Sequence, residues 1–354
     1  MLPMLFLLNC VPYMKSVKRI CAFIAGFVLF GAGLLKLMDP VGASLVVGEY
    51  FSFFHFGFLT SLSKVAAVLF ALLETVVGLA LLTGISPRVT SLVSGVLLLF
   101  FTLLTLILWI KNPPMDCGCF GEAIHLTHFQ SFIKNVVLCA LWAVAFLPLK
   151  SVWKPPRVKT ASFAIALVSV IAFTVYSLMN VPAMDFTPFK PGATLMQAQL
   201  TPSADSPLLS ICSQDGEYCD ELLATGHKLL LTAYDPEDLS ELSTISRREF
   251  GEALRAAGTA ELLFVAAGEF PGAEGAYTAD RRTLMSLNRS NGGATLLSNG
   301  VVVAKWPARS LPELSKIECL VSLDPASAVA QENTPRRLKL QGFLLYLFAV
   351  VLLI

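Results

Sequence analysis

The stretch that decides the fold lies at residues 89–110 and reads VTSLVSGVLLLFFTLLTLILWI. It contains no charged side chain, and most of its residues are Leu, Ile, Val or Phe. About 20 consecutive apolar residues are enough for a helix to cross the hydrocarbon core of a bilayer. Each large apolar residue favours insertion by about 0.3 to 0.6 kcal/mol. The stretch therefore predicts a transmembrane helix.

Working outward from it, four more stretches predict transmembrane helices, at residues 19–38, 64–83, 129–149 and 160–179. The whole chain is 55% hydrophobic and 14% charged, whereas soluble domains carry roughly a quarter charged residues. The net charge of +1 excludes the basic surface that a nucleic-acid-binding protein needs. We expect a protein embedded in the lipid bilayer, with no nucleic-acid partner.

The chain divides by composition into four predicted segments. A membrane-embedded helical domain covers residues 16–150, and a fifth transmembrane helix covers 160–180. Residues 185–334 have the composition of a water-exposed domain. A short apolar segment, 338–354, falls short of a full span. This last segment predicts either a sixth transmembrane helix or a tail that lies at the membrane interface.

Lysine and arginine in short loops predict the orientation, because cytoplasmic loops carry more of them. The cations that mark one side of the membrane are Lys15, Lys18, Arg19, Arg88, Lys150, Lys154, Arg157 and Lys159. The alternate loops, 39–63 and 111–128, contain a single lysine or arginine between them, Lys111. We therefore expect a multi-pass inner-membrane protein with a cytoplasmic N-terminus and a periplasmic soluble domain. Three cations that precede the last apolar run, 342–354, weakly oppose this orientation, namely Arg336, Arg337 and Lys339.

The strongest local motif is Asp116-Cys117-Gly118-Cys119-Phe120-Gly121, which follows the third predicted helix. Two thiols with one glycine between them can close a very small disulfide ring, because glycine permits the backbone conformation that such a ring requires. Strained, exposed disulfides have oxidising potentials and suit thiol exchange. The motif predicts a redox pair. A metal site and an inert structural pair remain alternatives.

The metal alternative involves His125 and His128. Together with Cys117 and Cys119 they offer two imidazoles and two thiolates, a set that suits zinc or copper. The two histidines are also polar residues at the mouth of a predicted transmembrane helix, where a polar side chain needs no further role. In a redox site, either histidine could instead stabilise a thiolate or act as its base.

Glu74 is an ionisable residue inside a predicted transmembrane helix, and such residues mark functional or paired sites. Lys36 and Asp39, at the outer end of the first helix, lie at a suitable depth to be its partners. A Lys36–Glu74 pair would lock two helices together. The alternatives are a proton or quinone role for Glu74, or a carboxylate that snorkels to the membrane surface without a role. The Phe-rich loop 39–63 predicts an amphipathic lid at the membrane interface, and the wall of a substrate or quinone pocket is the alternative.

The water-exposed domain begins with a predicted hairpin at residues 208–223, with a turn at Asp215-Gly216. This register places Cys212 opposite Cys219, within disulfide distance. Cys319 is then left over. Farther along, the predicted strands are 228–234, 261–267, 294–297 and 301–305, and the predicted helices are about 244–257 and 278–288. Strand, helix, strand, helix and hairpin are the order of an α/β thioredoxin-like sheet.

At this point a family resemblance can be stated for residues 16–150. The residues behind it are GFVLF at 26–30 with Gly33, Lys36, Asp39 and Pro40, then Glu74, Gly78, Leu81, Leu82 and Gly84, and DCGCFG at 116–121. The first two groups resemble two helices of DoxX-like membrane proteins. The third resembles the MauE (methylamine utilisation) branch. With a divergent thioredoxin-like domain after it, the arrangement is similar to membrane proteins of Bacteroidetes.

The resemblance implies a four-helix bundle in the inner membrane and a link to thiol–disulfide chemistry. MauE proteins are associated with maturation of a disulfide-rich enzyme subunit, and DoxX relatives with quinone-linked sulfur oxidation. The second domain departs from thioredoxins. Residues 235–239, DPEDL, stand where a Cys-x-x-Cys loop is expected, and residues 291–295, NGGAT, lack the proline that precedes the last hairpin. This domain is predicted to dock a partner or present a substrate.

The leading hypothesis is an oxidoreductase in which Cys117 and Cys119 cycle between dithiol and disulfide. Exported thiol proteins or a periplasmic redox partner would be its clients, and a quinone or a thiol protein its electron acceptor. One alternative is a non-enzymatic assembly factor whose thioredoxin-like domain binds a partner. The other is a metal-handling membrane protein.

Overall fold

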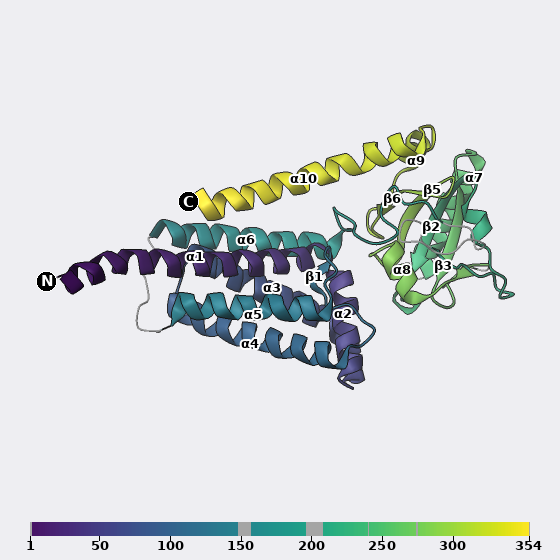
Figure 1. Ribbon diagram of the computed structural model, residues 1–354. Coiled ribbons are helices and arrows are strands. Elements are labelled where there is room, and N and C mark those ends of the chain that lie inside the picture. The colour runs from purple at the N-terminus through teal and green to yellow at the C-terminus, as the bar shows by residue number, and fades with distance from the viewer. Residues whose placement is uncertain (1, 148–156, 196–207, 240, 274, 354) are drawn as a thin grey trace. The chain divides into compact units, whose positions relative to one another are not determined.

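The computed structural model describes residues 2–147, 157–195, 208–239, 241–273 and 275–353 (Figure 1). They form two compact units. The first comprises Met1–Val175 and Phe343–Ile354, and the second comprises Tyr176–Gly342. The predicted helical domain and most of the fifth helix thus fall in one unit, and the predicted water-exposed domain falls in the other. The predicted segment 338–354 is divided between them.

The first unit is helical. Its elements are α1 (Leu2–Met38), α2 (Pro40–Phe53), the 3₁₀ helix η1 (Gly57–Leu62), α3 (Ser63–Thr83), α4 (Pro87–Lys111), the short strand β1 (Cys119–Glu122), α5 (His128–Phe146) and α6 (Arg157–Met179). Five stretches in the described residues are long and apolar enough to cross a membrane: Lys15–Met38, Gly57–Thr83, Pro87–Lys111, His128–Phe146 and Arg157–Met179. They confirm the five predicted transmembrane helices. The end of the chain lies in another helix, α10 (Pro325–Leu353), which is not among these candidate spans.

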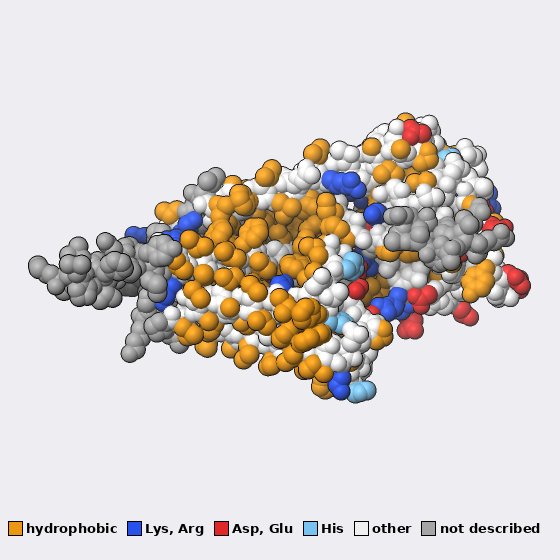
Figure 2. All heavy atoms as spheres, in the orientation of Figure 1, with side chains coloured by type: hydrophobic (Ala, Val, Ile, Leu, Met, Phe, Trp, Pro, Cys, Tyr) orange, Lys and Arg blue, Asp and Glu red, His pale blue; other side chains and the backbone are white. Residues whose placement is uncertain are grey.

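Four helices of this unit pack on one another: α1 contacts α3 and α5, and α4 contacts α3 and α5. Glycines let α1 and α3 approach closely. A Cβ at Gly78 would lie 2.3 Å from the Phe30 backbone nitrogen, and one at Gly33 would lie 2.3 Å from Thr75 Oγ1. Small residues at helix interfaces permit such contact in membranes. Hydrophobic side chains cover the visible outer face of these helices (Figure 2), as lipid contact requires.

Helix α2 lies across one end of the long helices of this unit (Figure 1). Asp39 fixes its start, because the Asp39 carboxylate accepts a hydrogen bond of 2.9 Å from the Gly42 backbone. The sequence predicts a lid for residues 39–63, and the structure resolves this stretch into α2 and η1. Asp39 is thus a helix cap, whereas the partner of Glu74 is Lys36.

The second unit contains a five-stranded mixed sheet in the order β4-β3-β2-β5-β6. The strands are β2 (His227–Ala233), β3 (Glu261–Ala266), β4 (Tyr277–Thr278), β5 (Gly293–Ser298) and β6 (Val301–Trp306). The helices are η2 (Asp220–Leu223), η3 (Pro236–Asp238), α7 (Glu241–Ala256), α8 (Arg281–Leu287), α9 (Leu314–Val321) and the first part of α10. Strand β2 pairs parallel with β3 and antiparallel with β5, and β5 pairs antiparallel with β6. The four predicted strands and two predicted helices are present in the predicted order, whereas β4, η3 and α9 were not predicted.

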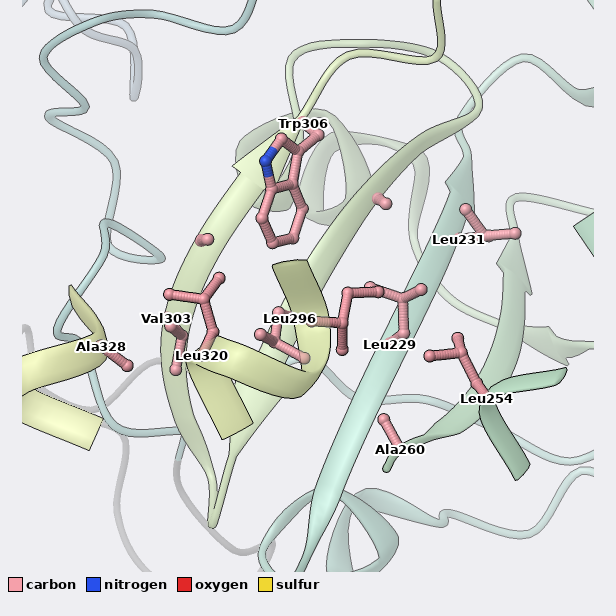
Figure 3. Packing of buried hydrophobic residues seen from close by; sticks show 12 residues of the cluster. Leu229, Leu231, Leu254, Ala260, Leu296, Val303, Trp306, Leu320 and Ala328 are labelled. Carbon is pink, nitrogen blue, oxygen red and sulfur yellow. The ribbon is translucent and has the colours of Figure 1, made fainter. Parts of the chain in front are cut away.

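The core of this unit lies between the sheet and its helices. Leu229, Leu296 and Val303 from the strands pack with Leu254 from α7 and Leu320 from α9 (Figure 3). All five are almost fully buried. Alternate strand residues point to the same face, which is why residues of three strands meet in one cluster.

The predicted hairpin at 208–223 needs a correction. Cys212 pairs with Tyr218, not with Cys219, because three residues, Gln214–Gly216, form the turn instead of two. A shift of one residue turns a side chain to the opposite face. The second predicted strand also ends early, because the Asp220 carboxylate accepts hydrogen bonds from the backbone of Ser210 and Ile211 and η2 begins there. Cys212 and Cys219 are free thiols, so their disulfide stays a prediction without the register that motivated it.

Candidate functional site

The two cysteines of the Cys-Gly-Cys motif face each other at the start of β1. The sulfur atoms of Cys117 and Cys119 lie 3.2 Å apart, within hydrogen-bond distance for a thiol and a thiolate. Both are free thiols. Cys117 is 4% exposed, whereas Cys119 is half-buried. The motif therefore forms a close dithiol in which Cys119 is the more accessible member.

Two features of the sequence hold this loop in shape. Gly118 has a φ of +61°, a left-handed conformation that favours glycine, and a Cβ at this position would lie 2.5 Å from Val46 Cγ1 of α2. The hydroxyl of Tyr50, also on α2, donates a hydrogen bond to the carbonyl oxygen of Cys117. Burial, and next the nearby Cys117, raise the pKa of Tyr50, so the phenol keeps the proton that it donates. The dithiol is thus tied to α2.

The surroundings shift the pKa values of the two thiols in opposite directions. The hydrogen bond from Cys117 lowers the pKa of Cys119 well below its ordinary value, and the Lys134 and Lys36 ammonium groups lower it further against the effect of burial. The same hydrogen bond and burial raise the pKa of Cys117. Cys119 is therefore the thiolate of the pair, and Cys117 is the protonated donor.

The predicted ion pair between Lys36 and Glu74 is present. The Lys36 Nζ and a Glu74 carboxylate oxygen lie 2.5 Å apart, and the Glu74 side chain is only 2% exposed. Lys36 also lies over the Phe101 ring, 5.7 Å from its centroid. The pair joins α1 to α3 inside the membrane unit and neutralises a charge that would otherwise be costly there.

These groups share one cavity of about 440 Å³ in the membrane unit. Its polar lining includes the dithiol, the Lys36–Glu74 pair, Lys134 and Asn135. The rest is apolar and rich in aromatic rings: Tyr50, Phe51, Phe54, Phe56, Phe70, Phe100 and Phe101. Ligand pockets typically have about 300–1,000 Å³ and few convergent polar groups in an apolar wall. The cavity has the size and chemistry of a site for a small apolar ligand.

The predicted histidines lie outside this cavity lining. His125 forms an exposed contact with Asp116, with 3.3 Å between Nδ1 and the carboxylate oxygen. His128 is buried, and its Nε2 lies 3.1 Å from the carbonyl oxygen of Pro113. Over the described ranges, no three His, Cys, Asp or Glu side chains are placed to hold a metal ion. The metal alternative thus finds no support there, and both histidines contact residues of the loop between α4 and α5.

Lys134 is the main site residue that the sequence reasoning missed. It lies on α5, within a candidate span, and its ammonium lies 4.9 Å from the centroid of the Phe120 ring. Asn135, beside it, donates to the Phe101 carbonyl and the Thr105 hydroxyl on α4. The sequence does mark this residue, because a lysine inside an apolar stretch is as unusual as a glutamate such as Glu74.

Comparison with known families gives a match for the first part of the chain. Residues 14–149 match the family described as methylamine utilisation protein MauE. The match confirms the predicted resemblance to MauE over this stretch, which contains the dithiol and every cavity-lining residue. No curated protein and no solved structure matches the chain.

Proposed function

We propose that this MauE-family membrane protein is a thiol–disulfide redox protein that oxidises exported proteins through Cys117 and Cys119. The family description supports a membrane accessory role in methylamine utilisation. The observation behind the redox proposal is the dithiol itself: two free sulfurs 3.2 Å apart, one of them shifted toward the thiolate form. Thiolates are the reactive species in disulfide exchange.

The reaction has two halves. In the first, a reduced client gives two electrons and two protons to the Cys117–Cys119 disulfide, so the client gains an S–S bond and the protein regains its two thiols. In the second, an acceptor removes two electrons and two protons from the dithiol and the disulfide reforms. The low pKa of Cys119 favours the first half, because a thiol of low pKa is a good leaving group.

The proposed site faces the outside of the inner membrane. The distribution of lysine and arginine in the loops supports a cytoplasmic N-terminus. Lys18, near the start of the candidate span Lys15–Met38, donates to the carbonyl of Leu147 at the end of α5, which is consistent with these two ends lying at the same surface. We propose that α1, α3, α4 and α5 form a four-helix bundle with the dithiol at its outer end, and that the second unit lies in the periplasm.

We further propose that the second unit is a thioredoxin-like docking module without exchange activity. Its strand order and the parallel and antiparallel pairings support this fold. Where a thioredoxin would have its cysteines, Asp235 forms a two-bond ion pair with Arg281, and Asn291 bonds to the Asp235 backbone. This position is thus built from fixed polar contacts suited to binding rather than to redox chemistry.

The test uses purified protein in lipid nanodiscs, with its thiols first oxidised. Reduced, unfolded ribonuclease A serves as a model client, and free thiols are counted on both proteins by mass spectrometry after alkylation. The wild type should oxidise the client stoichiometrically and become reduced at Cys117 and Cys119. The double variant Cys117→Ser/Cys119→Ser should be inactive.

The matched control is Cys21→Ser/Cys139→Ser, which removes two half-buried cysteines from α1 and α5 but leaves the dithiol intact. This control should retain the activity of the wild type. Equal client oxidation by both double variants would remove the proposal and leave the assembly-factor alternative.

A further inference from the structure

We infer that the cavity beside the dithiol binds a lipid-soluble quinone, which accepts the electrons of Cys117 and Cys119. This inference rests on the proposed redox function and names its electron acceptor. The dithiol and the cavity are one structure, because Cys117, Gly118 and Cys119 form part of the cavity wall. A ligand in this space would therefore contact the reactive sulfurs directly.

The residues that line the cavity favour a flat, apolar ligand. Six phenylalanine rings and Tyr50 surround the space, and two of these rings, Phe70 and Phe100, lie parallel with 6.1 Å between their centroids. Aromatic walls favour flat, apolar ring systems, which stack on them. Charged, water-soluble oxidants such as glutathione disulfide would lose their hydration in such a wall without recovering it.

The burial of Cys117 favours a small acceptor on the cavity side. Cys117 is 4% exposed, so a protein can reach the pair only through Cys119, whereas a small ligand in the cavity contacts both sulfurs. The loop is fixed by Tyr50 and by the close contact between Gly118 and Val46. A small molecule inside the cavity contacts the dithiol without opening this loop, since Cys117 and Cys119 are part of the cavity lining.

Lys134 places a positive charge in the cavity lining. The described residues place no carboxylate within ion-pair distance of its ammonium, in contrast to Lys36, which is paired with Glu74. An unpaired cation in a membrane helix is costly and usually has a functional partner. A quinone oxygen gains negative charge as it is reduced, and a fixed cation in a water-poor site stabilises such charge.

The electrons balance as follows. The Cys119 thiolate bonds to a carbon of the quinone ring. Cys117 then attacks the Cys119 sulfur, so the S–S bond forms, the C–S bond breaks and its electron pair stays on the ring. The ring oxygens take up the proton of Cys117 and the proton that Cys119 had released earlier. One dithiol and one quinone thus become one disulfide and one hydroquinone.

The experiment measures a single turnover of the reduced full-length protein in nanodiscs with decylubiquinone. Quinone absorbance and free thiols are followed together, and the expected result is one quinone reduced for each Cys117–Cys119 pair oxidised. Leu104→Trp fills the cavity and should slow quinone reduction by about tenfold or more, equivalent to roughly 1.4 kcal/mol. Leu106→Trp makes the same change two residues away on α4, outside the lining, and should react like the wild type.

A second pair of variants controls for the possibility that Leu104→Trp disturbs folding. Val47→Trp fills the cavity from α2, and Leu45→Trp changes the same helix outside the lining. Equal rates of quinone reduction in all four variants would overturn the inference. The inference would also be overturned if organic extracts of the purified protein contained only phospholipid and neither cavity-filling variant slowed quinone reduction. A lipid chain would then be the natural occupant of the cavity.

The two proposals fail separately. If the dithiol oxidises ribonuclease A but does not reduce decylubiquinone, the proposed function stands and the quinone inference is wrong. The Cys117→Ser/Cys119→Ser variant can also be tested for binding of radiolabelled decylubiquinone. Binding that is lost when Leu104→Trp is added supports the quinone site even if the protein fails to oxidise its client.

Discussion

Replacing Gly118 by alanine should damage the dithiol loop more than the same change at Gly121, although both glycines have a φ of +61°. An L-residue in the left-handed region costs about 1–2 kcal/mol, so both variants carry this penalty. Only at Gly118 does the new Cβ also collide, at 2.5 Å from Val46 Cγ1; at Gly121 the nearest atoms lie 3.7 Å away, an ordinary contact. Overpacking typically adds about 1–3 kcal/mol.

Gly118→Ala should therefore destabilise the membrane unit by about 2–5 kcal/mol and Gly121→Ala by about 1–2 kcal/mol. A second change isolates the collision. In a Val46→Ala background the clashing methyl groups are gone and the remaining Cβ lies 3.2 Å away, so Gly118→Ala should then cost about as much as Gly121→Ala. Reversible SDS titration in mixed micelles, followed by helical circular dichroism, measures each free energy of unfolding.

The same proteins report on redox chemistry. The fraction of Cys117–Cys119 disulfide at a fixed glutathione ratio should change with Gly118→Ala and return toward the wild-type value with Val46→Ala. The reasoning fails if Gly118→Ala and Gly121→Ala cost the same within about 0.5 kcal/mol, or if Val46→Ala gives no coupling beyond the error of a double-mutant cycle.

Two further predictions concern the charged groups of the cavity. Lys36→Met leaves Glu74 buried without its partner and should cost about 3–5 kcal/mol, whereas Lys36→Met/Glu74→Gln should recover most of this stability; unfolding titrations in micelles measure both, and strictly additive costs would contradict the pairing. Alkylation of Cys119 by iodoacetamide should already reach its plateau at pH 7 and decline only in acid, because its pKa lies well below the ordinary 9.0. Lys134→Met should move this pH profile upward, and an unchanged profile, measured by mass spectrometry of the modified peptide, would exclude an effect of the lysine on the thiolate.

The sequence predicts the elements well where periodicity and composition decide them. The five transmembrane helices, four of the five strands of the second unit's sheet and the Lys36–Glu74 pair follow from apolar runs, turn residues and the cost of an unpaired charge in lipid. The Cys212–Cys219 register does not follow, because one extra residue in the turn reverses the face of every following side chain.

The cavity could not be predicted in the same way. Its walls come from α1, α2, α3, α4, α5 and the dithiol loop, and no local pattern states which faces of these elements meet. Tyr50 illustrates the limit. It lies in a Phe-rich stretch that predicts an interfacial lid, with a pocket wall as the alternative, but no pattern predicts that its hydroxyl donates to the Cys117 carbonyl. Lys134 was within reach of sequence reasoning, but its relation to Cys119 depends on how α5 packs beside β1.

The charge balance of the cavity bears on which way electrons flow. Lys36 and Glu74 neutralise each other, so the unpaired ammonium of Lys134 is compensated chiefly by the Cys119 thiolate. Forming the disulfide removes this negative charge and leaves the lysine uncompensated in an apolar wall. Whatever stabilises the thiolate stabilises the reduced protein, and a dithiol with a stabilised reduced form makes a strongly oxidising disulfide. In the proposed reaction such a disulfide takes electrons from client thiols, and the electrons then need an acceptor of still higher potential, which is the role that we infer for a quinone in the same cavity.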